Sequence, residues 1–126
     1  MSQSNLISHQ IDNALQVYSK QVEGVMKTAL EEEAQETAAE LKATSPKRAK
    51  GSKAGAYARS WGVTKRGDTC IVHNKQHYRL THLLENGHVV RNGVGTFGRV
   101  GPIKHIEPAL RKAEQRLPER IEERLK

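Results

Sequence analysis

The residues best suited to chemistry are gathered in the stretch between positions 77 and 108. Five side chains of the types that bind zinc lie here: His77, His82, Glu85, His88 and His105. Zinc sites use histidine and carboxylate ligands, but at compact spacings such as His-Glu-x-x-His. His82 and Glu85 are three residues apart, His88 follows a helix stop, and no such signature is present. We therefore predict no metal site, and expect these histidines to fix a helix end and the following loop by hydrogen bonds.

The sequence gives even less support for other kinds of catalytic or cofactor-binding site. Cys70 is the only cysteine, which excludes an internal disulfide, and its apolar neighbours predict a small buried residue in a strand. No serine stands in a Gly-x-Ser-x-Gly turn. Residues 93–98 fit Gly-x-Gly-x-x-Gly, but no clear strand precedes them and no helix follows directly. We predict that this chain is not an enzyme and binds no cofactor.

The stretch also contains the elements that position these side chains. Residues 78–86 have leucines at helical spacing, which predicts a short amphipathic helix. Gly87 is placed to end it in a left-handed conformation. A glycine-rich segment, 91–101, is expected to be a loop. The chain then restarts as a helix at Glu107 and Pro108, since proline suits a first helical turn.

A long amphipathic helix is predicted from Ser4 to about Ala43. Apolar residues recur at steps of three and four on one face, and good helix formers fill the rest. Such a helix would span about 60 Å, which is more than a small domain covers. Two interpretations stay open: an oligomerisation helix that packs on another subunit, or a helix packed wholly on its own sheet and kinked near Gly24.

The middle of the chain predicts a basic loop followed by strands. Residues 44–56 contain Pro46, Gly51 and Gly55 and are read as a mobile loop. The loop has four cations: Lys47, Arg48, Lys50 and Lys53. Residues 57–65 and 69–73 read as a hairpin, with a turn at Arg66-Gly67-Asp68. Further strands are expected near 89–90 and 99–103.

These elements predict a single α+β domain. Its parts are a long helix (1–43), a basic loop (44–56), a sheet with a short helix and a glycine-rich loop (57–106), and a C-terminal helix (107–126). The small sheet is expected to be antiparallel and flanked by the two long helices. Pro118 should kink the last helix or split it in two.

Charge is distributed unevenly along the chain. The net charge is +7, yet residues 1–43 have three Lys or Arg against seven Asp or Glu, while residues 44–106 have twelve against two. A basic middle favours polyanions or acidic protein faces, including the acidic arm of a neighbouring copy. No run approaches the roughly 18 apolar residues of a membrane span, so no membrane contact is expected.

A family resemblance rests on three segments of the sequence. They are Thr44-Ser-Pro-Lys-Arg48, Gly55-Ala-Tyr-Ala-Arg-Ser-Trp61, and HYRLTHLLENGH (77–88) followed by a Gly/Arg loop and HIEPA (105–109). Together they resemble the small neck proteins of long-tailed bacteriophages, the tail-completion or head–tail connector proteins related to gene product ten of a lambda-like phage. The resemblance covers about half of the chain, and the first 43 residues carry no motif that matches it.

The resemblance implies a structural protein of the virion. It would complete the tail or join it to the head, as a ring of six copies around the DNA channel. Partners would be other copies and neighbouring neck and tail proteins, met at the head–tail interface after assembly in the host cytoplasm. The motif positions that hold the structure would be Trp61, Tyr78, Leu83, Leu84, Glu85, Gly87, His88, His105 and Pro108.

Two loops would face partners or DNA on this reading. Their cations are Lys47, Arg48, Lys50 and Lys53 in the first loop and Arg91 and Arg99 in the second. The alternative is a basic nucleic-acid-binding protein that uses residues 44–106 as its footprint. That alternative predicts tight, strongly salt-dependent binding to duplex DNA, whereas a neck protein needs only weak contact.

Overall fold

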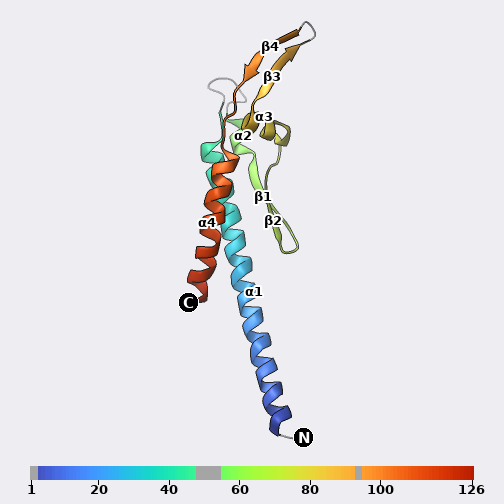
Figure 1. Ribbon diagram of the computed structural model, residues 1–126, viewed down its shortest axis with the longest axis vertical. Coiled ribbons are helices and arrows are strands. Elements are labelled where there is room, and N and C mark those ends of the chain that lie inside the picture. Colours follow the sequence, from blue (N-terminus) through green and yellow to red (C-terminus); the bar gives the residue numbers. More distant parts are fainter. Residues whose placement is uncertain (1–2, 48–54, 93–94) are drawn as a thin grey trace.

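The computed structural model has one long helix that carries the rest of the chain at one end (Figure 1). It describes residues 3–47, 55–92 and 95–126, with the side chains of 3–4 and 88–100 left out. The helices are α1 (Gln3–Thr44), α2 (Ala56–Arg59), the 3-10 turn η1 (Tyr78–Leu80), α3 (Thr81–Asn86) and α4 (Ile106–Leu125). The strands are β1 (Trp61–Arg66), β2 (Thr69–Asn74), β3 (His88–Asn92) and β4 (Gly95–Val100). The predicted α+β class is confirmed.

The two halves of α1 have different surroundings. From Ala29 onward the helix has a buried face, which packs against α4 on one side and against β1 and β2 on the other. Before that point its side chains are exposed or half-buried, and Figure 1 shows this half projecting alone from the body. Its 24 residues from 3 to 26 span about 36 Å at ~1.5 Å per residue. The helix continues unbroken through Gly24. The interpretation in which a helix kinked near Gly24 packs wholly on its own domain is therefore wrong.

Helix α4 runs antiparallel to α1, and opposite charges join them. Four carboxylates of α1 meet four cations of α4: Glu32, Glu33, Glu36 and Glu40 with Lys112, Arg116, Arg120 and Arg124. Glu33 is the most buried of them, with Arg116 at 2.9 Å and Arg120 at 3.1 Å. The sequence left open that this acidic arm meets the basic middle of a neighbouring copy, but four of its carboxylates are paired within their own chain.

The strands form two separate antiparallel hairpins, not one sheet. β1 pairs with β2 from Trp61↔Asn74 to Arg66↔Thr69, and Gly67 makes the turn with a φ of 58°. This hairpin lies along α1, where Lys65 binds Glu31 at 2.5 Å. β3 pairs with β4 through an irregularity between Val89 and Arg91 and projects away from the helices (Figure 1).

Three local predictions in the middle of the chain are wrong. Residues 57–59 belong to the helical turn α2, because the left-handed conformation of Gly55 (φ 74°) lets the chain begin a turn there. Residues 95–100 are a strand, since pairing with β3 overrides the low strand preference of glycine, and Ile103 lies beyond it. Cys70 is half-buried rather than buried, because the face of β2 that carries it is only partly covered.

Two predictions about α3 and α4 also differ from the structure: the conformation that ends α3 and the effect of the proline inside α4. Gly87 does end α3, but with φ 77° and ψ 170°. That is an extended conformation open essentially to glycine alone, not the left-handed helical one that was predicted. Helix α4 contains Pro118 and is not split by it. Contacts with α1 on both sides of this proline hold the two parts in one helix.

The core is small and lies where the helices and the first hairpin meet. Leu41, Tyr57, Trp61 and Ala109 are its buried members, with Val72, Leu84 and Ile106 packed against them. Trp61 also donates its ring N–H to the buried hydroxyl of Ser45, 2.7 Å away. The end of α1, α2, β1 and the start of α4 are therefore fixed relative to one another.

Candidate functional site

The side chain of Glu85 caps the start of α4 from the neighbouring helix α3. Its Oε1 accepts the backbone N–H groups of His105 and Ile106, each at 2.9 Å, and its Oε2 accepts that of Glu107 at 3.1 Å. His105 makes no side-chain capping bond of its own. Pro108 has no N–H, so the carboxylate satisfies all three N–H groups that this helix start leaves unpaired, and its charge suits the positive end of the helix dipole.

His105 is the buried centre of the same cluster, with 2% of its surface exposed. Its Nδ1 lies 2.8 Å from the carbonyl oxygen of Ile103 and 3.1 Å from Oε1 of Glu85, and both of these atoms accept hydrogen bonds. The ring proton therefore belongs on Nδ1. Nε2 is then the acceptor for the hydroxyl of Tyr57, 2.8 Å away. The ring also packs edge-on against Tyr57 and Trp61.

The surroundings of the cluster shift two acidities. Burial opposes the charge of Glu85, but the three backbone N–H groups and His105 outweigh it, so its pKa lies below the usual value. Burial, with the Glu85 charge as a second cause, raises the pKa of Tyr57 to about 12. Glu85 is thus held ionised and Tyr57 held protonated at neutral pH, the states that their hydrogen bonds require.

Asn74 is a further buried residue of this region that the sequence reading missed. Its Nδ2 donates to the carbonyl of Tyr57 at 2.7 Å, and its Oδ1 accepts the N–H of His77 at 2.8 Å. It is 1% exposed and joins α2 to the turn after β2. An Asn that ends a strand and precedes a polar turn is a recognisable signal for such a backbone-bonding side chain.

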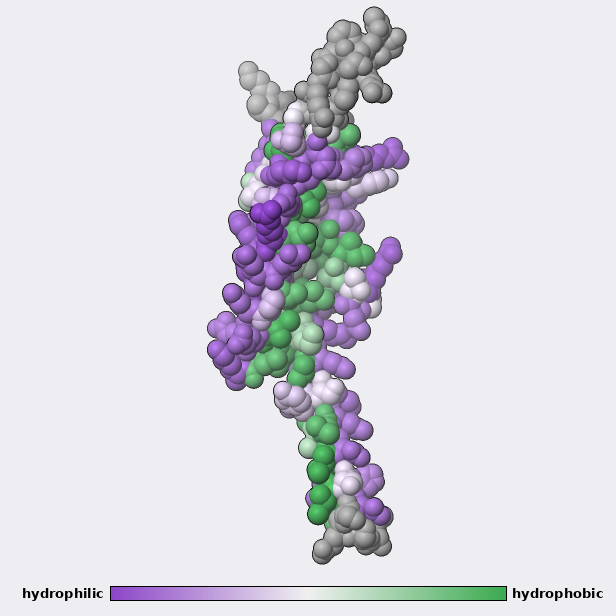
Figure 2. Space-filling model, in the orientation of Figure 1, coloured by the Kyte–Doolittle hydropathy of each residue, from purple (hydrophilic) through white to green (hydrophobic). Residues whose placement is uncertain are grey.

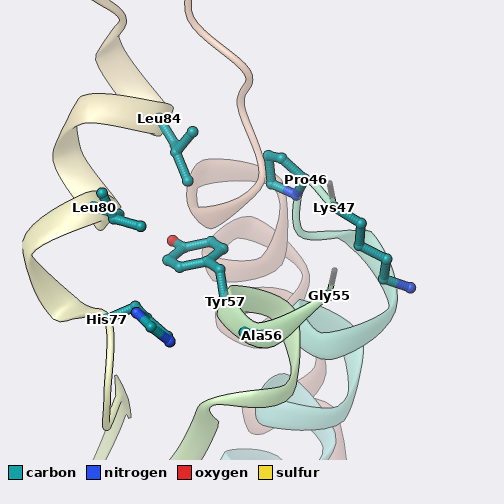
Figure 3. Close-up of a pocket in the computed structure, with 8 residues that line it drawn as sticks. All are labelled: Pro46, Lys47, Gly55, Ala56, Tyr57, His77, Leu80 and Leu84. Carbon is teal, nitrogen blue, oxygen red and sulfur yellow. The ribbon is translucent and has the colours of Figure 1, made fainter. Parts of the chain in front are cut away.

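A hollow of about 500 Å³ opens beside this cluster. Figure 3 shows the ring of Tyr57 between His77 and Leu80 on one side and Pro46 on the other, with Leu84 above it. The amine of Lys47, the one charged group of the lining, points away from the ring in this view. The lining is largely apolar, so the hollow can take up an apolar group.

The predicted site residues are brought together only in part. Glu85, His105 and Trp61 converge on one cluster, and Leu84 packs against it. Tyr78 is exposed, Leu83 is half-buried and Pro108 is exposed in the first turn of α4. Within the described residues, no group of three or more His, Cys, Asp or Glu side chains is placed to hold a metal ion. His82, for example, is exposed and apart from the buried pair.

The predicted partner-facing cations are mostly outside the described part of the chain. Lys47 is described and exposed. Arg48, Lys50 and Lys53 lie outside the described residues, as do the side chains of His88, Arg91 and Arg99. No helix in the described ranges is long and apolar enough to cross a membrane.

Comparison with known proteins identifies the family. A protein-family model matches residues 9–87, well over half of the chain, and is described as "Bacteriophage HK97-gp10, putative tail-component". The chain belongs to this HK97-gp10-like family. The match spans most of α1, the first hairpin and α3 with Glu85, so the capping residue lies inside the family region. Neither the curated proteins nor the solved structures gave a match.

Membership agrees with the resemblance drawn from residues 44–109, and it extends it in the N-terminal direction. The family model begins at residue 9 and so includes α1, in which no motif was recognised. As an HK97-gp10-like protein, this chain is a phage tail component, a structural part of a virus particle. The buried cluster of Tyr57, Glu85 and His105 then has a structural role, which is to hold the helices of this subunit in place.

Proposed function

We propose that this chain completes the tail of a long-tailed phage or joins it to the head, as a ring around the DNA channel. The observation that carries the proposal is the family match over residues 9–87. The ring would contain several copies, six by resemblance, and its neighbours would be the adjacent neck and tail proteins. Identical subunits close a ring through heterologous contacts, in which two different surfaces of each copy meet.

The shape of the subunit supports a role in assembly. A small core fixes α2, β1 and α4, while the free half of α1 and the β3–β4 hairpin extend beyond it in opposite directions (Figure 1). Extensions of this kind provide contact area to neighbours without enlarging the core. On this proposal the 47–53 segment and the 91–101 segment, which contains β4, dock to the next ring, and the Glu85–His105 cluster holds the base of the β3–β4 hairpin in place.

The work of such a protein is geometric. In the cluster, Tyr57, Glu85 and His105 are bound to one another and to the backbone, so they serve to position α3 against α4. The N–H of Ile103 also donates to the carbonyl of Leu84 at 2.7 Å, which ties the chain leaving β4 to α3. The base of the β3–β4 hairpin is therefore anchored to the core through backbone and side chain together.

Loss of the chain from the phage tests this function. Cells infected with a phage lacking it should accumulate filled heads and separate tails, and few joined particles, as seen by electron microscopy. Supplying the chain from a plasmid should restore joining. Normal yields of complete, infectious particles without the chain would refute the proposal.

The nucleic-acid alternative is tested on the isolated protein. The basic middle of the chain would give tight duplex binding, with affinity falling steeply as salt rises, because bound phosphates release counterions. A tail component working through protein contacts should bind duplex DNA weakly at physiological salt. Fluorescence anisotropy over a salt series separates the two, and tight binding at physiological salt would favour the alternative.

A further inference from the structure

The free half of α1 carries a continuous apolar stripe that nothing in the described chain covers. Its members are Ile7, Ile11, Leu15, Tyr18, Val22 and Met26. Tyr18 is 62% exposed and Leu15 60%, and Figure 2 shows a hydrophobic band running down this part of the helix. A contiguous exposed apolar surface of this length marks a contact with another molecule.

The stripe lies on the same face of α1 that α4 covers higher up. Leu15, Tyr18 and Val22 precede Glu33, Glu36 and Glu40 by eighteen residues each, which is five turns at 3.6 residues per turn. Those three glutamates bind the cations of α4. Helix α4 ends beside Glu32, where Arg124 reaches that carboxylate. The stripe therefore continues the packing face of α4 beyond the point where α4 stops.

The spacing of the stripe reads the same in both directions. Its six members are separated by steps of 4, 4, 3, 4 and 4 residues. When two such helices lie antiparallel, Ile7 faces Met26 of the second copy, Ile11 faces Val22, and Leu15 faces Tyr18. Every apolar side chain then meets an apolar partner, and steps of three and four are those of packed helix pairs. The stripe is complementary to itself.

The charges beside the stripe favour the same partner. The positions that flank it include Ala14, Ser19 and Gln21, and Asp12 is the one charged residue among them. In the antiparallel register Asp12 lies opposite Gln21 of the second copy, so no like charges meet. A partner chosen by charge would need a charged flank, which this half of α1 lacks.

The position of α4 decides the orientation of the pair. A parallel partner would continue alongside α1 past Met26, into the space that α4 occupies on that face. An antiparallel partner ends there, with its first residues approaching the end of α4. The apolar side chains of Leu117, Ile121 and Leu125 form a shallow groove at that end of α4.

We propose that the free protein is a twofold dimer, formed by antiparallel pairing of residues 7–26 of α1 from two copies. Such a contact uses the same surface on both copies and closes at two. A ring needs two different surfaces, so the dimer would be the form that exists before assembly and would open as subunits join the particle. This inference rests on α1 alone and stands or falls independently of the proposed role in the tail.

Light scattering after size-exclusion chromatography tests the dimer. The full chain should elute as a species of twice 14.1 kDa, dissociating only on dilution. Leu15→Glu should give a monomer with unchanged helix content, because the added carboxylate would be buried at the centre of the pair. The matched control Asn13→Glu adds the same charge on the opposite face of α1 and should remain dimeric. A monomer at every concentration, or a larger closed oligomer, would overturn the proposal.

Cysteine cross-linking tests the orientation. In a Cys70→Ser background, a mixture of Ile11→Cys and Val22→Cys chains should form a disulfide-linked heterodimer under mild oxidation. Each variant alone should cross-link poorly, because its own cysteines lie far apart in an antiparallel pair. Efficient cross-linking of Ile11→Cys to itself, with none in the mixture beyond that, would show a parallel pair and contradict the inference.

Discussion

At the scale of single residues, Glu85 connects two helices that are distant in sequence. The first backbone N–H groups of a helix are commonly capped by a Ser, Thr, Asp or Asn side chain at the N-cap position of the same helix. Here the cap comes from a carboxylate about twenty residues earlier, at 2.9 Å from two backbone nitrogens. The position of α4 against α3 therefore depends in part on this side chain and on the charge that it carries.

Replacing Glu85 by Gln should destabilise the fold by about 1–3 kcal/mol, because the neutral amide has one acceptor oxygen for three N–H groups. The effect depends on pH. Since folding lowers the pKa of Glu85, its charge stabilises the native state above the ordinary carboxyl range, and this contribution is lost as pH falls through the folded pKa. Urea titrations between neutral and acidic pH should show the two proteins converging. A gap that stays constant over this range would contradict the assignment.

The hydroxyl of Tyr57 gives a second prediction at this scale. Tyr57→Phe leaves Nε2 of His105 buried without a donor and should cost about 1–3 kcal/mol of unfolding free energy. The matched control is Tyr78→Phe: Tyr78 is 59% exposed, and removing its hydroxyl should change the unfolding free energy by less than about 0.5 kcal/mol. Equal stability of the two variants in denaturant titrations would show that the buried hydrogen bond is not formed.

The residues of the cluster were predictable only by type. Helical spacing and Gly87 located α3, and the expectation that the histidines serve structure by hydrogen bonding holds for His105. Which partner each group finds was not visible, because Glu85, His105 and Tyr57 are separated by up to 48 positions. Such pairs are set by how the elements pack, which one sequence does not show.

At the scale of elements, α4 holds together although Pro118 lies inside it. Proline lacks the N–H that would bond the carbonyl four residues earlier and costs an isolated helix about 3 kcal/mol. Arg116 and Arg120, on either side of it, both bind carboxylates of α1, so tertiary contacts offset the local cost. The sequence correctly marked a weak point, but the contacts that compensate for it come from another helix.

Pro118→Ala should stabilise the protein by about 1–3 kcal/mol, because it restores a helical hydrogen bond and the side chain is exposed. Thermal unfolding followed by circular dichroism measures the gain. Glu119→Ala, on the exposed surface next to it, controls for the removal of a large side chain and should change little. A drop in melting temperature for Pro118→Ala would mean that the proline shapes α4 in a way its helical bounds do not reveal.

The hairpins show where local propensity fails. Glycine-rich residues 95–100 were predicted to be part of a loop, yet they pair with β3 at both ends of the strand. Conversely, the turn at Gly67 and the strand after it were predicted nearly to the residue, because turn chemistry is local. The prediction for β4 failed because its strand pairing with β3 depends on contacts between segments and not on local residue preferences.

At the scale of the whole molecule, the chain combines a small body with a projecting helix. The ion pairs of α1 begin at Lys27 and its buried positions at Ala29 among the described residues. The helix was predicted correctly, with both an oligomerisation role and packing on the body left open. The structure shows that the C-terminal half packs on the body, whereas the N-terminal half extends beyond it with its side chains largely exposed.

Removing the first 24 residues should therefore leave the stability of the body almost unchanged, within about 1 kcal/mol by urea unfolding. The comparison belongs at low protein concentration, because association would add stability to the full chain. At high concentration the full chain should become the more stable of the two. A truncated chain that fails to unfold cooperatively would show that the free half of α1 contributes to the core.

If the chain forms a ring in the neck of the virus particle, imaging the particle tests this most directly. Cryo-electron microscopy of the mature phage should show this chain as a ring around the DNA channel at the junction of head and tail. Side-chain density for the Glu85–His105 cluster should appear inside each subunit, away from any neighbour. A complete neck that contains no copy of the chain would contradict the account.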